Sequence, residues 1–279
     1  MSIIFSAIVP HPPILLPVLN KDYLEHLENT QKSLDKIKKT LEKLKPDIIV
    51  VISPHGKKQL DVFSINTSSE FDINFEKFGD FNTNFKMLGE INLGIKIKEK
   101  LIESNIPCAC ENEDFKKTIK NLQLKKINSP ELDHGTSLPL YFLAQNLEKT
   151  KILSIHSSGL SPEDHLNFGN FLGKELINSN KKIAIISSGD LSHSLSKNSP
   201  AKYSSLGEKF DKKLIKYLTN KNTLEILAFD KKLIKKAEEC GLKSFLILLG
   251  ILENIAYTPQ LLSYEFPFGV GYLVMEFNN

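Results

Sequence analysis

The sequence predicts an α/β protein: a single compact domain with a central, mostly parallel sheet flanked by helices. Short, continuously apolar, β-branched runs such as "DIIVVIS" (47–53) and "KKIAIISS" (181–188) are typical of parallel strands covered on both faces. Amphipathic stretches with helical spacing alternate with these runs to the end of the chain. No linker, repeat or low-complexity block interrupts the 279 residues, so we expect one domain over 1–279.

The first half of the chain is expected to begin with a strand at 3–9 and a helix at 21–45. The helix is predicted from leucines and isoleucines at helical spacing, with lysine and glutamate between them, and Pro46 ends it. The elements expected after it are a strand at 47–53, a strand at 61–66, an irregular Phe- and Asn-rich segment at 70–88, a helix at about 90–104 and a short strand in "IPCAC" (106–110).

The second half continues the alternation. Ser161 is a predicted N-cap, because Pro162 stands at the first helical position and Glu163 and Asp164 fill the first turn. The elements expected here are a helix near 137–147, a strand at 151–156, the helix starting at Ser161, a strand at 181–188, helices over roughly 203–256 and a closing hairpin around 267–269.

Composition excludes several functional classes. All 36 basic residues are lysine and the formal net charge is only +3, so nucleic acid is not an expected partner. Three cysteines, Cys108, Cys110 and Cys240, form no disulfide pattern, which favours a reducing cytoplasm. The apolar start lacks a basic region, and no apolar run is long enough to cross a bilayer. We therefore expect a soluble cytoplasmic protein without a membrane partner.

Four of the seven histidines follow a predicted strand or occupy a sharp turn. His11 follows 3–9, His55 follows 47–53, His193 follows 181–188, and His134 lies in the turn "LDHG". Ligands of open α/β sheets bind beyond the carboxyl ends of the strands, which is where these residues stand. Neutral imidazole binds iron, zinc and copper, so the four histidines together predict a metal site.

The other three histidines are weaker candidates. His26 and His165 fall within amphipathic helices and are expected at the surface. His156 ends a predicted strand, so it remains a candidate, although a structural role is the simpler interpretation.

The third metal ligand is left open by the residues alone. The segment "KKAEECGLKS" offers Glu238, Glu239 and Cys240 just ahead of a helix. A glutamate would complete a site of two histidines and one carboxylate, which suits Fe(II), whereas Cys240 would give a softer site suited to iron or copper.

Seven motifs follow one another along the chain: "PHPPILLP", "PDIIVVISPHG", "LDHGTSLPL", "SSGDLSH", "AEECGLKS", "LLG" and "YEFPFGVGY". Their order resembles the class III extradiol dioxygenase family, the LigB-type superfamily that also contains the Memo proteins. The resemblance spans nearly the whole chain. The branch that looks most similar is the prokaryotic one named AmmeMemoRadiSam system protein B.

The resemblance implies a role for each site residue. It selects His11 and His55 as metal ligands, His193 as the active-site acid/base and His134 as a histidine on the substrate side. In the dioxygenases the third ligand is a glutamate or histidine before a late helix, and in Memo proteins it is a cysteine followed by glycine. Glu239 and Cys240 therefore both remain candidates for this position.

The resemblance also implies a cofactor and partners. Fe(II) is the expected metal, with copper or zinc as alternatives, and the expected substrates are a catechol-type aromatic and O₂. The alternative is a Memo-like iron- or copper-binding redox protein that does not cleave rings and acts with a partner, such as a radical-SAM enzyme. A zinc-dependent hydrolase is a remoter option, and a homodimer is left open.

Overall fold

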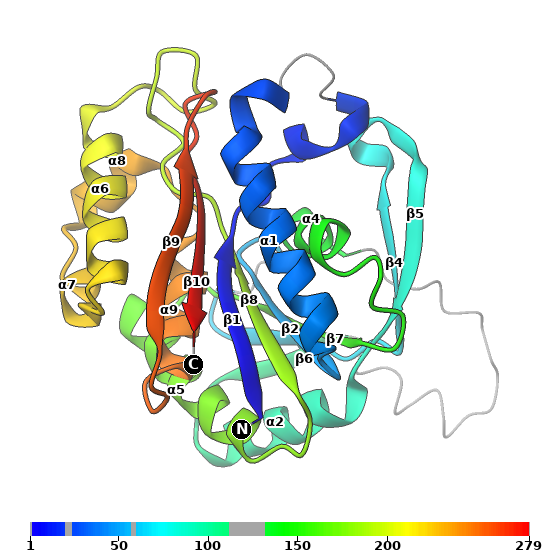
Figure 1. Cartoon of the computed structure of the whole chain (residues 1–279). Coiled ribbons are helices and arrows are strands. Elements are labelled where there is room, and N and C mark those ends of the chain that lie inside the picture. The colour runs from blue at the N-terminus through cyan, green and yellow to red at the C-terminus, as the bar shows by residue number, and fades with distance from the viewer. Residues whose placement is uncertain (1, 20–23, 57–59, 112–131, 279) are drawn as a thin grey trace.

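The computed structural model describes residues 2–19, 24–56, 60–111 and 132–278 (Figure 1). Its main sheet consists, in spatial order, of β6 (Cys108–Glu111), β3 (Phe63–Asn66), β7 (Lys151–His156), β2 (Ile48–Ser53), β8 (Ile183–Ser188), β1 (Ile3–Val9), β10 (Tyr272–Asn278) and β9 (Thr258–Glu265). The four central strands, β7, β2, β8 and β1, are parallel. β10 and β9 are antiparallel additions at one edge, and β3 pairs antiparallel with β7 at the other.

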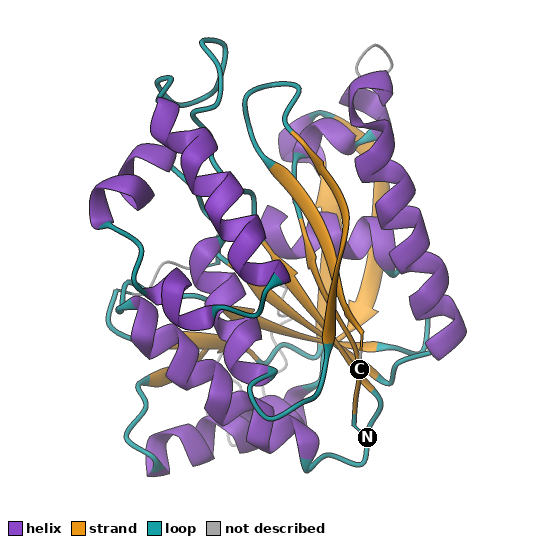
Figure 2. Ribbon diagram, turned by 60° about the vertical axis from the view of Figure 1, so that its left-hand side comes forward, coloured by secondary structure: helices purple, strands orange, loops and turns teal. Residues whose placement is uncertain are grey.

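Helices cover both faces of the sheet (Figure 2). One face packs against α2 (Ile91–Glu103), α5 (Pro162–Ile177), α6 (Ser205–Thr219), α8 (Lys231–Ala237) and α9 (Leu242–Ile251). The other packs against α1 (Glu28–Leu44), α4 (His134–Leu143) and the hairpin of β4 (Glu70–Phe75) and β5 (Asp80–Leu88). The short α7 (Thr223–Leu227) lies between α6 and α8, and the 3-10 turns are η1 (Pro13–Leu15), η2 (Pro17–Leu19), η3 (Leu24–Leu27) and η4 (Glu76–Phe78). The predicted α/β class with a mostly parallel sheet is confirmed.

The central strands are apolar throughout because no face of them meets water. Every residue of β2 and of β8 is buried, and alternate side chains of each strand enter two separate hydrophobic clusters. Val50 and Ile52 pack toward α5 and α9, whereas Ile49 and Val51 pack toward α1 and α4. Burial on both sides accounts for the continuous β-branched runs that predicted these strands.

The structure differs from the expectation at 70–88, where an irregular segment was predicted and the β4–β5 hairpin is found. β4 buries Phe71, Ile73 and Phe75 and turns the residues between them outward, so it has the period of a strand with one covered face. The irregular assignment was wrong because the asparagines and acids that obscured the pattern occupy the outer face of the hairpin.

The predicted helix at 21–45 is shorter than expected in its regular part. α1 begins at Glu28, after the 3-10 turn η3, and residues 20–23 lie outside the described ranges. α4 begins at His134, three residues earlier than predicted, because Asp133 caps it. Both differences concern helix ends, which depend on local hydrogen bonds more than on apolar spacing.

The first and last described residues lie at the same end of the strands of the main sheet. β1 pairs antiparallel with β10, with Ala7 opposite Glu276 and Ile8 opposite Met275. The start of β1 is therefore beside the end of β10, as both views show (Figure 1, Figure 2). Among the residues that the structure describes, no helix is long and apolar enough to cross a membrane.

Candidate metal centre

The four central strands end at one level, which brings together the residues that follow them. Val9 of β1 is opposite Ser188 of β8, and Ser53 of β2 is opposite His156 of β7. Because these strands are parallel, their carboxyl ends lie together at one end of the sheet, opposite the end at which the chain begins and finishes. The loops that carry His11, His55 and His193 all leave from this carboxyl end of the strands.

His11 is fixed by the end of the neighbouring strand β8. Its backbone N–H donates to Asp190 Oδ1 at 3.0 Å, and its Nδ1 lies 2.8 Å from Ser188 Oγ. These contacts aim the other ring nitrogen, Nε2, at His55 Nε2, which is 3.0 Å away. The two histidines predicted as ligands therefore direct a nitrogen each toward one place.

His134 joins this pair from the first turn of α4. Its ring stacks on His55 with centroids 4.3 Å apart and planes inclined by 24°. Asp133 caps the helix by accepting the Thr136 N–H. The next residue, Gly135, must lack a side chain, because a Cβ there would lie 2.4 Å from Ser53 Oγ and 3.3 Å from the His55 ring. The "LDHG" motif thus packs α4 closely against the loop that carries His55.

The three rings are kept uncharged. Burial, together with the nearby His134, lowers the pKa of His11 to about 3. Loss of water and the neighbouring His11 also lower the pKa of His55, and burial lowers that of His134. At neutral pH their nitrogens therefore offer lone pairs, as metal ligation requires. His11 is buried while His55 is exposed, so the cluster is reached by solvent from the His55 side.

The two candidates for the third ligand face different ways. Cys240 Sγ lies 3.5 Å from His11 Nε2 and accepts the Asp190 N–H at 3.2 Å. Glu239 instead accepts the Leu242 N–H at 2.7 Å, at the start of α9. Burial raises the pKa of Glu239 to about 7, and burial beside Asp190 raises that of the Cys240 thiol well above its ordinary value. In this arrangement Cys240, and not Glu239, is in contact with the histidines.

His193 is held on a loop that is tied to the end of α8. Its N–H donates to the Ala237 carbonyl at 2.9 Å, and the hydroxyl of Ser192 donates to the same carbonyl. The ring Nε2 lies 4.0 Å from Asp190 Oδ2. Nδ1 is buried and has no hydrogen-bond partner among the described residues. Because the side chain is 24% exposed while Nδ1 is enclosed, Nε2 is the ring nitrogen through which His193 could exchange a proton with a bound molecule.

Asp190 connects these loops, and the sequence reasoning did not single it out. Its carboxylate lies 3.9 Å from His11 Nε2, and its carbonyl accepts the Gly241 N–H. Burial raises its pKa to about 6. A Cβ at the preceding Gly189 would lie 2.2 Å from Gly241 Cα, so two glycines permit this approach. Its position two residues after β8, matching His11 after β1 and His55 after β2, was the available signal.

The remaining histidines are distributed differently. His26 is exposed, as expected, but His165 is fully buried, so the prediction of a surface position for His165 was wrong. Its Nδ1 lies 2.7 Å from the Ser161 carbonyl and its Nε2 accepts the Ser158 N–H, which satisfies the ring inside the protein. His156 is buried beside Asp133 at the end of β7.

Two overlapping groups of donor atoms could hold a metal ion in the described part of the chain. One consists of His11, His55 and His134, and the other of His11, Asp190 and Cys240, with donors within 4.8 Å of one another in each. The 3.0 Å between the nitrogens of His11 and His55 suits two neighbouring ligands of one ion, given metal–nitrogen bonds of about 2.0–2.1 Å. The residues present therefore fit a transition metal bound through His11, together with a ligand from each group: His55 or His134 from one, and Asp190 or Cys240 from the other.

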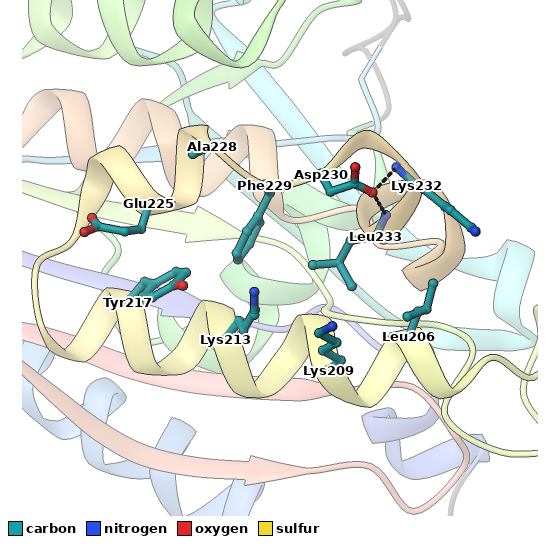
Figure 3. A pocket seen from close by; sticks show the side chains of 10 residues that line it. All are labelled: Leu206, Lys209, Lys213, Tyr217, Glu225, Ala228, Phe229, Asp230, Lys232 and Leu233. Atoms are coloured by element: carbon teal, nitrogen blue, oxygen red, sulfur yellow. Dashed lines mark hydrogen bonds between the residues drawn. The ribbon is translucent and has the colours of Figure 1, made fainter.

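A pocket lies between α6 and the α7–α8 segment (Figure 3). This pocket, of about 430 Å³, is lined by Lys209, Lys213, Tyr217 and Phe229 among others. Its Asp230 carboxylate accepts the N–H groups of Lys232 and Leu233 (Figure 3). None of the clustered histidines lines it, so it is separate from the metal centre.

Comparison with known proteins shows the family to which the chain belongs. The family described as the catalytic LigB subunit of aromatic ring-opening dioxygenase matches residues 6–275, which is nearly the whole chain. The chain belongs to the LigB family.

Two individual relatives extend the comparison. Protein CA_C1420 of Clostridium acetobutylicum is 35% identical over 277 residues, and the match covers 99% of this chain. The chain spans 58% of the length of that relative. The crystal structure of uncharacterized protein JW3007 from Escherichia coli K12 superposes with a TM-score of 0.67 at 15% identity, covering 98% of this chain and 99% of the other. At that identity the superposition shows that the two proteins share a fold.

Proposed function

We propose that the protein is a non-haem Fe(II) oxidoreductase of the extradiol-dioxygenase type, which opens a catechol-type aromatic ring with O₂. The observation that carries the proposal is the convergence of His11 and His55, whose nitrogens are 3.0 Å apart. His193 and His134 lie at the same carboxyl end of the strands. Bound iron would supply the path for electrons between the aromatic ring and O₂. His11, His55 and Cys240 are the proposed ligands, since Cys240 Sγ lies 3.5 Å from His11 Nε2, whereas Glu239 belongs to neither group of converging donor atoms.

His193 is the proposed acid/base. Its Nε2 lies 4.0 Å from Asp190 Oδ2 and the side chain is partly exposed, so Nε2 is the nitrogen that would take the proton of a phenolic hydroxyl and later return it. Histidine is the side chain best suited to move protons near neutral pH. His134, stacked on His55, borders the space in which the substrate would lie.

An aromatic substrate is supported by the surroundings of His134. Phe78 is half-buried and its ring centre is 6.0 Å from that of His134, at a steep angle. Aromatic rings favour such edge-to-face contacts, so a substrate ring beside His134 would have Phe78 as an aromatic neighbour. Copper or zinc could occupy the same donors, which the metal analysis below distinguishes.

The proposal is tested by anaerobic reconstitution with Fe(II), followed by metal analysis and O₂ uptake with a panel of catechols. We expect one equivalent of iron in the wild type, loss of iron in His11→Ala, and weakened binding in Cys240→Ser but not in Glu239→Gln. His193→Ala should keep its iron and lose turnover at least about 100-fold. Native-rate cleavage by His193→Ala would refute the acid/base assignment, and a wild type that binds no metal would refute the centre itself.

A second candidate is supported by Cys240. A cysteine as the third ligand, beside His11 and His55, is the donor set that the Memo branch would have, and it suits an iron- or copper-binding redox protein that works with a partner enzyme. The AmmeMemoRadiSam B branch, with a radical-SAM partner, belongs to this candidate. Stoichiometric iron or copper without O₂ uptake on any catechol would favour it over the dioxygenase.

A further inference from the structure

His156 lies outside the proposed ligand set, yet it is among the most heavily bonded polar side chains of the protein. It ends β7 and is only 3% exposed. Its Nδ1 is 2.9 Å from Glu111 Oε1, and its Nε2 is 3.1 Å from Asp133 Oδ2. A neutral imidazole has one N–H and could serve only one of these carboxylates, whereas the imidazolium serves both. The geometry therefore points to a charged ring clamped between two acids.

The clamp continues directly to His55 through hydrogen bonds. Asp133 uses its other oxygen, Oδ1, to accept the hydroxyl of Ser53 at 2.5 Å. The same hydroxyl oxygen accepts the backbone N–H of His55 at 3.2 Å. His156, Asp133, Ser53 and His55 thus form one chain of contacts in which each member orients the next.

A second path leads from His156 to His134. Asp133 is the N-cap of α4 and binds the N–H and the hydroxyl of Thr136, so the carboxylate that His156 holds also fixes the first turn of the helix. His134 is the first residue of that turn. The orientation of Asp133 therefore sets where the His134 ring stacks on His55.

Packing connects His156 to the His55 loop independently of these hydrogen bonds. A Cβ at Gly56 would lie 2.0 Å from Cγ of the His156 ring, so the backbone just after His55 rests on the imidazole itself. Removing the ring would open a space beneath this loop, since protein interiors are close-packed.

We infer that His156 is a positioning residue: through Asp133 and Gly56 it sets the places of His55 and His134 relative to each other. The inference deepens the proposed function, on which it rests for the statement that His55 binds the metal. Partners that orient a ligand from behind typically change metal affinity about 10- to 100-fold when they are removed. His156 acts on His55 indirectly, through the carboxylate of Asp133 and through the loop that contains Gly56.

The test uses His156→Gln in the full chain, because glutamine is of similar reach but carries no charge and cannot serve both acids in the same way. Co(II) is titrated into the metal-free protein and its visible absorption bands are recorded. We expect binding to weaken about tenfold or more and the bands to change in position or intensity, because His55 is displaced. Wild-type affinity with unchanged bands would overturn the inference.

A matched control separates positioning from general loss of stability. His165→Gln also removes a fully buried, hydrogen-bonded imidazole, but its partners are the Ser158 N–H and the Ser161 carbonyl. We expect this variant to unfold more easily while keeping Co(II) affinity within about twofold of wild type. If both variants lost affinity equally, in proportion to their loss of stability, His156 would be merely structural.

A pair of variants tests whether His156 acts through Asp133. Asp133→Asn and His156→Gln, made singly and together, should have non-additive effects on Co(II) affinity, because residues in one network couple. Additive effects would place His156 on a different path. Should His156→Gln fail to fold, Glu111→Gln weakens the clamp from the far side of the ring and should lower Co(II) affinity in the same direction.

A metal-independent measurement keeps this inference distinct from the proposed function. In the metal-free protein labelled with ¹⁵N-histidine, His156→Gln should shift or broaden the ring signals of His55 and His134. The exposed His26 serves as the unaffected internal reference. Unchanged His55 and His134 signals would refute the positioning role whether or not the wild type binds a metal. Failure of the wild type to bind Co(II) would refute only the proposed function.

Discussion

Glu239 and Cys240 show how far neighbouring residues can differ in role. Both precede α9, and both were candidates for the same position. Cys240 faces His11, while the side chain of Glu239 turns back to the N–H of Leu242. An anion at the start of a helix is favoured by the unpaired N–H groups there, which gives Glu239 a structural purpose of its own. One residue thus contributes to the cluster, and the other supports the helix that follows it.

The charge on His156 should be visible in the pH dependence of stability. Burial alone would lower the pKa of His156, but its contacts with Asp133 and Glu111 raise it to about 9. Because the pKa is raised on folding, its stabilising contribution is complete below about pH 6.5 and is lost as pH rises toward 9. The free energy of unfolding, measured by urea titration, should therefore fall over that range in the wild type.

His156→Gln should lack most of this alkaline loss. His165→Gln should retain it, because burial lowers the pKa of His165 to about 4, and that histidine titrates on the acid side. Identical curves for wild type and His156→Gln above pH 6.5 would show that the clamped ring is not charged.

Strand ends made part of the cluster predictable from sequence. His11, His55 and His193 could be placed together because each follows a buried strand, and parallel strands share an edge. Asp190 follows its strand at the same spacing and could have been included, whereas the role of Asp133 depends on which hydrogen bonds its carboxylate makes. His165 was misplaced because one polar residue in an amphipathic helix is ordinarily exposed, whereas this ring finds two backbone partners inside.

At the scale of elements, two N-caps of similar chemistry have different consequences. Ser161 caps α5 in a reciprocal arrangement with Asp164, at the surface. Asp133 caps α4 and also pairs with His156 inside the protein. The second cap is therefore part of the site, and the first is not.

Replacement of each cap by alanine should separate these roles. Ser161→Ala should lower the free energy of unfolding by about 1 kcal/mol, as loss of an N-cap usually does, with Co(II) binding unchanged. Asp133→Ala should cost about 3 kcal/mol or more, because it leaves the His156 imidazolium with one acid fewer, and it should weaken Co(II) binding as well. Urea denaturation and Co(II) titration measure both. Equal effects of the two variants on stability would mean that the buried pair contributes little.

The central strands could be predicted because burial on both faces requires a continuous run of apolar, β-branched residues. β1 has the bounds expected for it, and β2 and β8 differ from expectation only at their starts. The β4–β5 hairpin could not be predicted in the same way, since it covers the core with one face only and its outer residues follow no apolar rule. Its polar outer face made it resemble a loop.

At the scale of the whole molecule, a buried carboxyl group joins three separate parts. Asp211 of α6 accepts the hydroxyl of Tyr264 in β9 at 2.6 Å, and the N–H of Ser192 in the His193 loop at 2.9 Å. Burial raises its pKa to about 7, despite the two donors. The edge of the sheet, a covering helix and a loop of the site therefore meet at one titrating group.

Stability should respond to this group between about pH 4 and 7. Because folding raises the pKa of Asp211, this group binds its proton more readily in the folded protein, so its contribution to the free energy of unfolding falls as pH rises. The buried histidines with lowered pKa values, such as His11 and His165, contribute in the opposite direction over the same range. Asp211→Asn should remove the falling contribution, so the free energy of unfolding should change more positively with pH in this variant than in the wild type. Urea titrations at several pH values measure the slope. Asp35→Asn, an exposed change in α1, controls for net charge, and an unaltered slope in Asp211→Asn would contradict the prediction.

The antiparallel pairing of β1 with β10 has a practical consequence for anyone who handles this protein. The start of β1 and the end of β10 lie side by side, at the opposite end of the strands from the histidines (Figure 1). A fusion partner or surface anchor attached to either one should therefore point away from the cluster. For the same reason a short linker could join the two ends, and new ends could be opened elsewhere on the surface by circular permutation. Immobilised or permuted forms should thus leave the histidine cluster accessible to small molecules.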